Sequence, residues 1–371
     1  MLKLCIVNPF EREGGAEYQI SLLINALAAS GLWEIHYLAH FLAEDGRTRN
    51  YQAVRIGGGG RAPRFGYVTE AASLYRELRR INPAVIYQRV ACGYTGVCAY
   101  YSRRHAVPLI WHVAHDMDVT SRVPSERNFV RLRLEKEAVK YAARRATGIV
   151  VQTRDQAELL QKNYGRHATA VIPNFQPVPT EVIDKSGVLT VVWIANMKRW
   201  KRPEVFVRLA QRFANRADIR FIMVGAPADG TGDVAWQKSL SASIESTPRL
   251  EYWCRRTQTE VNQLLGQAHI FVNTSVQEGF PNTFIQSWMR DVAVVSLTVD
   301  PDGILERERV GIAAQTEEGL AVAVESLLDQ KNLLAEYVKR GRDHAFARHS
   351  LDNATRLAGL LESFATRATS E

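Results

Sequence analysis

The sequence contains no apolar run long enough to cross a membrane and no metal-binding pattern of cysteines. A spanning helix needs about 18 or more consecutive apolar residues, and no segment of the 371-residue chain approaches that length. The four cysteines form neither a CxxC pair nor a Cys/His cluster; they are Cys5, Cys92, Cys98 and Cys254. Cysteines scattered in this way are typical of reduced thiols in a cytosolic protein and argue against a structural zinc site.

The glycine-rich motif of dinucleotide-binding proteins is also missing. Neither Gly14-Gly15 nor the glycine run at residues 57–60 has the GxGxxG spacing. The second run is flanked by arginines at positions 55, 61 and 64, and we interpret it as a surface loop. The apolar start of the chain, residues 1–8, is too short for a signal peptide and predicts a first buried strand. We therefore expect a cytoplasmic protein, either soluble or peripheral on the inner face of the membrane.

Negative charge is scarce in the first half of the chain. Residues 1–180 contain 24 Lys and Arg against 15 Asp and Glu, whereas residues 181–371 contain 23 against 24. Several of these cations lie in a predicted amphipathic helix over residues 126–145: Arg127, Arg131, Arg133, Lys136, Lys140, Arg144 and Arg145. Such a helix either lies on an anionic membrane surface or is a solvated face with ion pairs along the helix. Nucleic acid is not expected as a partner, because no binding motif accompanies the charge.

Short apolar runs alternate with helical patterns along the whole chain. The expected strands of the first half are 4–7, 35–38, 85–87, 109–111 and 149–151, with helices near 16–30, 68–80 and 126–145. A stretch with Pro177, Pro179 and Gly187 then predicts a linker. The pattern restarts with strands at 190–195, 221–224, 250–253, 270–273 and 293–296 and helices near 203–214, 258–266, 281–289, 317–329, 331–347 and 352–366. Alternation of this kind predicts an α/β fold with parallel sheets.

The most informative stretch is residues 278–286, EGFPNTFIQ, which directly follows the predicted strand 270–273. In a doubly wound α/β domain the carboxyl ends of the strands face the ligand. The backbone N–H groups of Asn282 and Thr283 open the next predicted helix, and the positive end of a helix suits an anion. The sequence therefore predicts a ligand loop for a phosphate group.

This loop, followed by Ser287-Trp288 and by the strand 294–296, resembles the donor site of retaining GT-B glycosyltransferases of family 4. The resemblance implies two Rossmann-like domains facing each other across a crevice. It covers nearly all of the second half of the chain and only loops of the first half. In that family a Glu beside the donor sugar is followed eight positions later by a Glu that holds the nucleotide ribose. Here those positions are Glu278 and Gln286, and Gln still forms hydrogen bonds with hydroxyls.

The expected domain boundaries follow from this resemblance. Residues 1–180 are the acceptor-side domain and residues 181–350 the domain that binds the nucleotide sugar. The predicted helix in residues 351–371 either packs on the second domain or crosses back to the first, as the last helix does in that family.

A basic segment after the strand 190–195 has the chemistry of a diphosphate clamp. Lys198 and Lys201 lie where the strand leads into a helix, and point charges there neutralise phosphates and the charge that develops on a leaving nucleoside diphosphate. The family usually has an Arg at the position aligned with Asn196, and close variants move that cation to the position of Lys198. The alternative interpretation is a basic surface turn.

Two further segments come from the first half of the chain. Gly14 and Gly15 match the family's glycine loop beside the donor phosphates and the acceptor, although a Gly-Gly turn alone is usually only a loop. His115 matches the histidine that the family sets against the donor sugar, while the alternative is a structural histidine. Asp116 or Asp118 either orients His115 or caps the next turn.

The remaining donor-site residues are expected in loops of the second half. Gly225, in the segment 225–229, borders the nucleotide pocket, residues 252–256 support the base, and Phe280 and Pro281 belong to the ligand loop with Asn282 and Thr283. The segment Asp300-Pro-Asp302 resembles a metal-binding DxD motif, but the resemblance implies no metal and we interpret it as a loop.

The sequence therefore predicts a hexosyltransferase-type enzyme that moves a sugar from a UDP- or GDP-linked donor to a hydroxyl acceptor, with retention and without a cofactor. The catalytic residues would be His115, Glu278 and Lys201, and the acceptor a glycan or a lipid-linked glycan in polysaccharide or glycan assembly. The alternatives are a catalytically silent subunit that binds a sugar nucleotide and partners an active transferase, which Gln286 and Asn196 favour, and a GT-B epimerase or phosphorylase.

Overall fold

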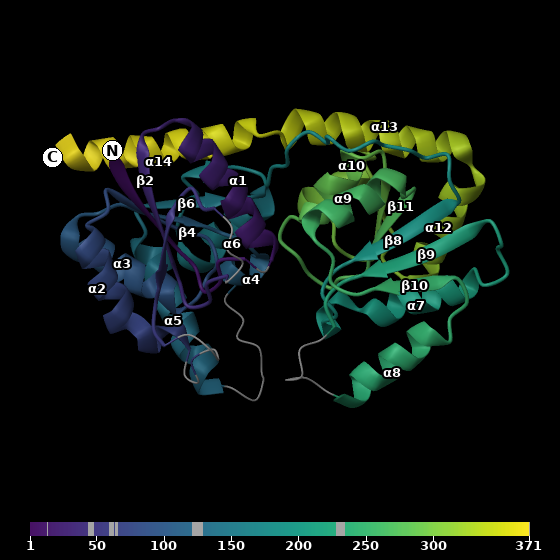
Figure 1. Ribbon diagram of the computed structural model, residues 1–371, viewed down its shortest axis with the longest axis horizontal. Coiled ribbons are helices and arrows are strands. Elements are labelled where there is room, and N and C mark those ends of the chain that lie inside the picture. The colour runs from purple at the N-terminus through teal and green to yellow at the C-terminus, as the bar shows by residue number, and fades with distance from the viewer. Residues whose placement is uncertain are drawn as a thin grey trace. The chain divides into compact units, whose positions relative to one another are not determined.

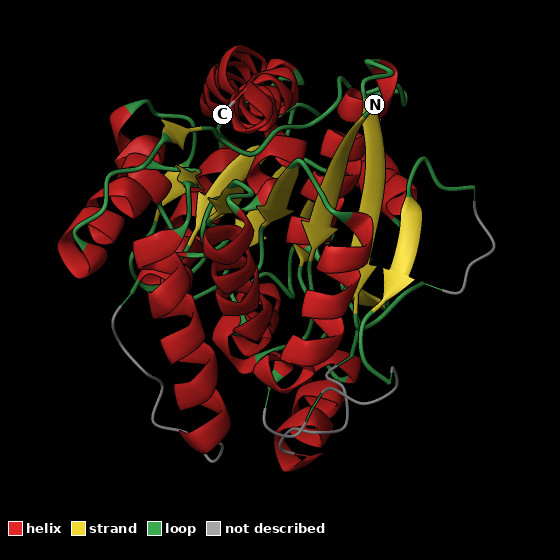
Figure 2. Ribbon diagram, turned by 90° about the vertical axis from the view of Figure 1, so that its left-hand side faces the viewer, coloured by secondary structure: helices red, strands yellow, loops and turns green. Residues whose placement is uncertain are grey.

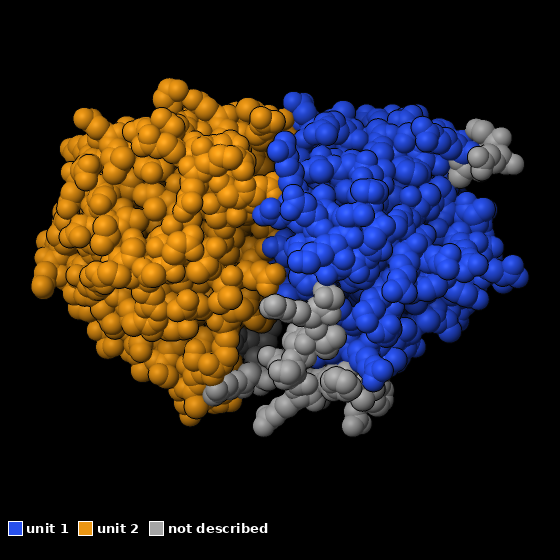
Figure 3. All heavy atoms as spheres, turned by 180° about the vertical axis from the view of Figure 1, so that it is seen from behind, with its two compact units in different colours: residues 1–175, 351–371 blue, residues 176–350 orange. Residues whose placement is uncertain are grey.

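The computed structural model describes residues 1–12, 14–43, 48–58, 63, 66–120, 129–227 and 234–370 (Figure 1). The chain divides into two compact units, one made of residues 1–175 and 351–371 and the other of residues 176–350 (Figure 3). Each unit contains its own parallel sheet with helices, so the predicted α/β class is confirmed. No helix in the described ranges combines the length and the apolar character that crossing a bilayer requires.

The first unit is built on a seven-stranded parallel sheet in the order β3-β2-β1-β4-β5-β6-β7. Its strands are β1 (Leu2–Val7), β2 (Trp33–Ala39), β3 (Gln52–Arg55), β4 (Val85–Gln88), β5 (Leu109–His112), β6 (Gly148–Val151) and β7 (Ala170–Val171). β1 is central, with Cys5 paired to His36 on one side and to Ile86 on the other. All of its later side chains are buried, as expected for a parallel strand covered on both faces.

Helices cover both faces of this sheet (Figure 2). They are α1 (Gly15–Ala29), η1 (Tyr67–Glu70), α2 (Ala71–Ile81), α3 (Gly93–His105), α4 (Asp116–Val119), α5 (Phe129–Arg145), α6 (Arg154–Tyr164) and α14 (Asp352–Ser370). Side chains of β1 alternate between the two cores: Leu4 and Ile6 pack with α1 and α14, and Cys5 and Val7 pack with α2 and α3. The last helix, α14, therefore belongs to the core of the first unit.

The basic helix of the first unit is only partly described. α5 begins at Phe129, and Arg127 and the side chain of Arg131 lie outside the described residues. Farther along, Lys140 forms an ion pair with Glu137 at 2.7 Å, and the ammonium group of Lys136 donates to the carbonyl oxygen of Thr120. The ion pair of Lys140 agrees with a solvated helix face, whereas Lys136 is half-buried, and neither contact tests lipid binding.

The second unit is built on a six-stranded parallel sheet in the order β10-β9-β8-β11-β12-β13. Its strands are β8 (Leu189–Ile194), β9 (Ile219–Val224), β10 (Leu250–Trp253), β11 (Ile270–Asn273), β12 (Ala293–Ser296) and β13 (Ile312–Ala313). Its helices are η2 (Arg199–Lys201), α7 (Pro203–Arg212), α8 (Val234–Glu245), α9 (Gln258–Gln267), α10 (Asn282–Trp288), η3 (Pro301–Gly303), α11 (Ile304–Arg307), α12 (Glu317–Asp329) and α13 (Lys331–Arg348). One face of the sheet packs on α7 and α12, and the other on α9 and α10.

The strand order reverses direction between β8 and β11. From β8 the chain moves outward through β9 to β10, and then returns to the other side of β8 to form β11, β12 and β13. At such a reversal the loops at the carboxyl ends of the two strands diverge and leave room for a ligand. The topology therefore predicts a binding site between the loops that follow β8 and β11.

Candidate functional site

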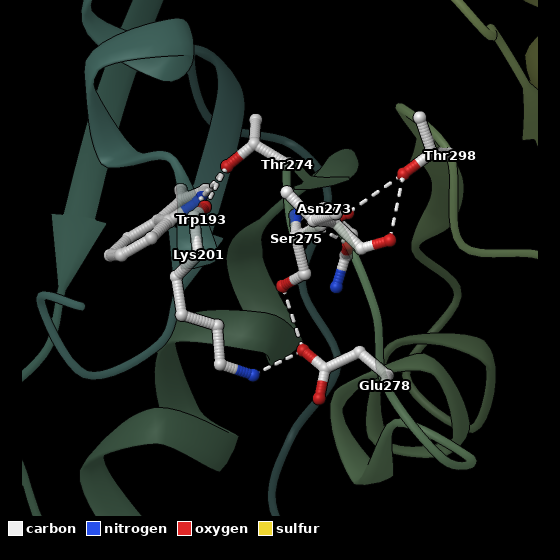
Figure 4. A network of polar contacts seen from close by, with 8 residues as sticks. Trp193, Lys201, Asn273, Thr274, Ser275, Glu278 and Thr298 are labelled. Carbon is white, nitrogen blue, oxygen red and sulfur yellow. Dashed lines mark hydrogen bonds and ion pairs between the residues drawn. The ribbon is translucent and has the colours of Figure 1, made fainter. Parts of the chain in front are cut away.

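The loops after β8 and β11 are held together by hydrogen bonds. The backbone N–H of Val276 donates to the carbonyl oxygen of Trp200 at 2.8 Å, and the hydroxyl of Thr274 donates to the carbonyl oxygen of Lys201 at 2.5 Å. The indole N–H of buried Trp193 in turn donates to the hydroxyl oxygen of Thr274 at 2.8 Å (Figure 4). This chain of bonds fixes the backbone of Lys201 to the end of β11.

Lys201 and Glu278 form an ion pair at the mouth of this junction (Figure 4). The carboxylate of Glu278 also accepts a hydrogen bond from the hydroxyl of Ser275 at 2.7 Å. The side chains of Lys201 and Glu278 are 18% and 15% exposed, so both are shielded while still reaching the surface. The pair therefore presents a cation and a hydrogen-bond acceptor side by side, which is the chemistry that a phosphate and a sugar hydroxyl require.

The turn that carries Glu278 is stabilised from beneath. The side-chain oxygen of Asn273 accepts from the backbone N–H of Ser275 at 3.0 Å, and the hydroxyl of Thr298 donates to the carbonyl oxygen of Ser275 at 2.9 Å. These supporting residues, together with Trp193 and Thr274, escaped the sequence analysis. The signal that could have found Asn273 and Thr274 is the polar sequence Asn273-Thr274-Ser275 at the end of a fully buried strand.

Lys198 is separate from this network. It is exposed, and its ammonium group lies 4.9 Å from the ring centroid of Trp200, which is a cation–π contact. Within the described residues it has no carboxylate partner. The aligned position Asn196 is exposed as well. The structure thus joins only one of the two predicted lysines to Glu278.

The helix after the ligand loop begins where the sequence predicts. α10 starts at Asn282, and Pro281 before it gives no side-chain hydrogen bond to the helix. Phe280 is buried, with its ring 4.6 Å from that of His349. Asn282 and Thr283 are half-buried at the first turn. Phe280 therefore anchors the loop to the core, and the polar start of α10 lies closer to the surface.

Gln286 is turned into the protein. It is 3% exposed, its side-chain amide nitrogen donates to the side-chain oxygen of Asn262 at 3.1 Å, and its backbone carbonyl oxygen accepts from the guanidinium group of Arg290 at 3.2 Å. Arg290 is itself buried and paired with Glu181. In this arrangement Gln286 ties α10 to α9.

Gly225, at the end of β9, is required by close backbone packing. A Cβ atom at this position would lie 1.8 Å from the carbonyl oxygen of Ala195, in the loop after β8. The phenol of Tyr252 donates to the carbonyl oxygen of Gly225 at 3.0 Å, and burial raises the pKa of Tyr252 to about 12. Asp229, the last residue of the predicted segment, lies outside the described residues. Gly225 thus shapes the same sheet edge that carries Lys201.

His115 follows β5 in the first unit and caps the short helix α4. Its Nδ1 accepts from the backbone N–H of Met117 at 3.1 Å, which requires a neutral ring with the proton on Nε2. Asp118 accepts from the backbone N–H groups of Ala114 and His115 at 2.9 and 3.0 Å, and burial raises its pKa. The carboxylate of Asp116 accepts from Gln156 at 3.0 Å. Asp118 therefore holds the turn, and Nε2 of His115 is the atom left for a ligand.

The predicted glycine loop opens α1. Gly14 and Gly15 are exposed, and Gly14 precedes the helix in an extended conformation. Of the second glycine run, Gly59, Gly60 and the neighbouring Arg61 and Arg64 lie outside the described residues. The structure therefore agrees with an accessible helix start at residues 14 and 15.

The DxD-like segment has a local structural use. The carboxylate of Asp300 accepts from the backbone N–H of Leu305 at 2.8 Å, and burial raises its pKa. Across the described ranges no group of three or more His, Cys, Asp or Glu side chains is arranged to hold a metal ion.

Comparisons with known proteins agree on one family. A family model described as "Glycosyl transferases group 1" matches residues 189–330, and one described as "Glycosyltransferase Family 4" matches residues 13–176. No curated protein matches the sequence.

Solved structures resemble the whole chain. Sucrose-phosphate synthase from Thermosynechococcus elongatus has a TM-score of 0.78 and 14% identity, over 98% of this chain and 99% of that one. HepE from Anabaena, solved with UDP and glucose, has a TM-score of 0.75 and 16% identity, over 98% and 100%. WaaG, a glycosyltransferase involved in lipopolysaccharide biosynthesis, has a TM-score of 0.76 and 12% identity, over 96% and 99%. At these identities the likeness shows the fold, which is the predicted GT-B type.

Proposed function

We propose that this chain, which belongs to the group 1 and family 4 type of GT-B glycosyltransferases, transfers a hexose from a nucleoside diphosphate sugar to a hydroxyl acceptor with retention. The observation that carries the proposal is the Lys201–Glu278 pair at the point where the strand order of the second sheet reverses. A cation and a carboxylate held together at such a point suit a donor that is anionic at one end and rich in hydroxyls at the other.

Binding of the donor would break the ion pair between Lys201 and Glu278 and give each residue a new partner. A diphosphate would replace the carboxylate beside Lys201, with Lys198 as a second cation at its rim, while Glu278 would accept from the hydroxyls of the sugar. Phe280 and Pro281 would hold the loop so that the start of α10, at Asn282 and Thr283, faces the phosphates. Gly14, Gly15 and Gly225 would let backbone approach the donor closely, and Gln286 would bind the ribose after leaving Asn262.

The bond changes of the proposed reaction balance without a redox step. A bond forms between the acceptor oxygen and the anomeric carbon on the face from which the diphosphate oxygen leaves. The acceptor proton passes to the departing phosphate, and Lys201 stabilises the charge that grows on it. The proposal assigns that stabilisation to lysine rather than to a metal cofactor. His115 would contact the reacting sugar through Nε2.

UDP is the proposed nucleotide, with GDP as the alternative. Solved structures of HepE hold UDP and UDP-glucose, and that protein shares the fold and 16% of the sequence of this chain. The proposed acceptor, a glycan or a lipid-linked glycan, would bind to the first unit, as part of polysaccharide or glycan assembly at the cytoplasmic face of a membrane.

Ligand-dependent stability tests the donor site. A ligand that binds only the folded state raises the apparent melting temperature, by an amount set by its concentration relative to Kd. UDP, GDP, ADP and their sugar derivatives would be compared on the wild type and on Lys201→Ala. We expect one nucleotide to shift the wild type and to lose most of that shift in the variant. Equal shifts of the melting temperature in both proteins would show that Lys201 does not contribute to donor binding.

A silent sugar-nucleotide-binding subunit is the second candidate. The buried, inward orientation of Gln286 favours it, because the residue aligned with the family's second Glu contacts Asn262 in place of open solvent. Binding of a sugar nucleotide without any release of nucleoside diphosphate, with every acceptor offered, would support this candidate over the transferase.

A further inference from the structure

A groove crosses the helical surface of the first unit. Helices α2, α3 and α5 lie side by side (Figure 1), and a cavity of about 1090 Å³ opens between them. Twelve residues line it: Val68, Ala71, Ala72, Tyr75, Arg76, Arg79, Arg80, Gly96, Val97, Tyr100, Ala138 and Tyr141. All of them belong to the first unit, and none is among the residues proposed for the donor.

Small residues create the space in this groove. Ala71 and Ala72 on α2 and Ala138 on α5 are the small side chains among the lining residues. Gly96 lets α3 approach α5 closely, because a Cβ atom there would lie 2.7 Å from that of Ala138. The apolar floor therefore offers room for a hydrocarbon chain.

Aromatic side chains border the floor. The phenol oxygen of Tyr75 lies 2.8 Å from Nε2 of His105, a bond that fixes the ring in the groove wall. Tyr100 is 56% exposed, and its ring centroid lies 6.1 Å from that of Tyr75. A tyrosine with an apolar ring and a wet hydroxyl is suited to the boundary between hydrocarbon and headgroups.

The rim of the groove carries positive charge that the described residues neutralise only in part. Arg76, Arg79 and Arg80 are exposed on α2, and none of the twelve lining residues is acidic. Arg80 pairs with Glu77 at 2.8 Å. Across the described residues, neither Arg76 nor Arg79 has an ion-pair partner. Two guanidinium groups are thus available to an anion beside an apolar floor.

We propose that this groove binds an anionic phospholipid of a membrane surface. The acyl chain lies along the floor formed by Ala72, Gly96 and Ala138, and the phosphate group contacts Arg76 and Arg79. Guanidinium groups bind phosphate through paired N–H donors, and their aliphatic stems pack on apolar surface. The groove deepens the membrane partner of the proposed function and assigns it to α2 and α3 in addition to the basic helix α5.

Vesicle flotation tests this assignment with the full chain. The probes are vesicles of phosphatidylcholine alone and of phosphatidylcholine mixed with phosphatidylglycerol, without donor or acceptor. We expect the wild type to float only with the anionic vesicles. The double variant Arg76→Ala/Arg79→Ala should partition about 30-fold more weakly, because each arginine near an anionic surface contributes about a factor of five.

The matched control is Arg103→Ala/Arg104→Ala, which removes two exposed arginines of α3 that do not line the groove. It should float like the wild type. Equal losses in both double variants would mean general electrostatic attraction, and no flotation of the wild type, or equal flotation with neutral vesicles, would also overturn the assignment. Melting temperature and sugar-nucleotide binding without lipid should be unchanged in both variants, so a failure of flotation leaves the proposed transfer untouched.

Discussion

Lys201 and Glu278, 77 residues apart in the sequence, form an ion pair where the loops after β8 and β11 meet. The pair is held from the Lys201 side by Thr274 and from the Glu278 side by Ser275. Two loops of different βα units thus build one polar site, and its geometry depends on the register of the strands beneath it.

The two residues of this pair should act as a unit. Lys201→Ala should lower kcat/KM by about 10²–10³, the usual cost of removing one group that stabilises developing charge. Glu278→Gln should act on the same step, because it removes the negative charge that pairs with Lys201 and leaves one acceptor oxygen for sugar hydroxyls in place of two. Steady-state kinetics of the single and double variants would measure the coupling, and the double variant should lose much less than the product of the single losses.

If the two losses multiplied, Lys201 and Glu278 would act independently and the joint donor site would be wrong. Arg212→Ala is a suitable control, because it removes an exposed ion pair of α7 with Glu318 at the surface of the same unit. It should leave kcat/KM unchanged.

Thr274 should matter through its hydroxyl alone. Thr274→Val keeps the shape of the side chain but leaves the indole N–H of Trp193 and the carbonyl oxygen of Lys201 without their partner. A buried group that loses its hydrogen bond costs about 1–3 kcal/mol of unfolding free energy. Chemical denaturation would measure it, and Thr274→Ser should recover most of the loss. A Val variant as stable as the wild type would contradict the role of this hydroxyl.

Gly225 should not tolerate a methyl group. In Gly225→Ala the new Cβ would meet the carbonyl oxygen of Ala195 at 1.8 Å, so β9 or the loop after β8 must move. We expect a loss of more than about 2 kcal/mol of unfolding free energy, in the range seen for overpacking of close-packed interiors.

Gly359→Ala is the matched control, since nothing lies within 4 Å of a Cβ atom at that position of α14. It should stabilise the protein by about 0.5–1 kcal/mol, because alanine favours a helix interior over glycine. Thermal unfolding would measure the stability of both variants. A Gly225→Ala variant as stable as the wild type would show that β9 and the loop after β8 are not packed as described.

His112 should make the protein sensitive to acid. Burial and the neighbouring guanidinium of Arg89 hold its pKa well below the usual value, and its Nδ1 lies 2.9 Å from Nη1 of Arg89. Below about pH 6.5 His112 binds a proton in the unfolded chain but stays neutral in the folded protein. The unfolding free energy should therefore decrease as the pH is lowered, by up to about 1.4 kcal/mol per pH unit for this residue.

Urea denaturation of wild type and His112→Asn between pH 7 and pH 5 would measure this slope. Asparagine keeps an acceptor for Arg89 but does not titrate, so the variant should show the weaker pH dependence. His269 and His344, whose pKa values burial also lowers, would leave a residual slope in both proteins. Parallel curves would mean that His112 is protonated in the folded protein.

The sequence pattern found most of the sheet but fewer of the helices. Buried parallel strands such as β11 and β12 were predicted to the residue, because both faces are covered and the first three positions of each strand are apolar. The helix α3 was missed, since its sequence GYTGVCAYYSRRH is buried on several sides and lacks a clear helical period. β3 and β13 were missed because they are short edge strands with half-exposed side chains.

The site could be predicted only where one segment carried the signal. Glu278 was proposed as a site residue from the EGFPNTF loop, and Lys201 from a basic turn after a strand. The contact between Lys201 and Glu278 depends on which strands are neighbours, and so does the hydrogen bond from Trp193 to Thr274, 81 residues apart. The local periodicity of a sequence does not indicate the order of the strands in a sheet. For the same reason the inward orientation of Gln286 toward Asn262 could not be foreseen.

The most direct test of the central claim is the release of nucleoside diphosphate from sugar nucleotides by the purified chain. UDP- and GDP-sugars would be offered with and without glycan acceptors, and the wild type compared with Lys201→Ala. The account predicts release from one class of donor, faster with an acceptor and lost in the variant, with the anomeric configuration retained in the product. A folded wild type that binds a sugar nucleotide but releases nothing, or releases it equally well without Lys201, would contradict it.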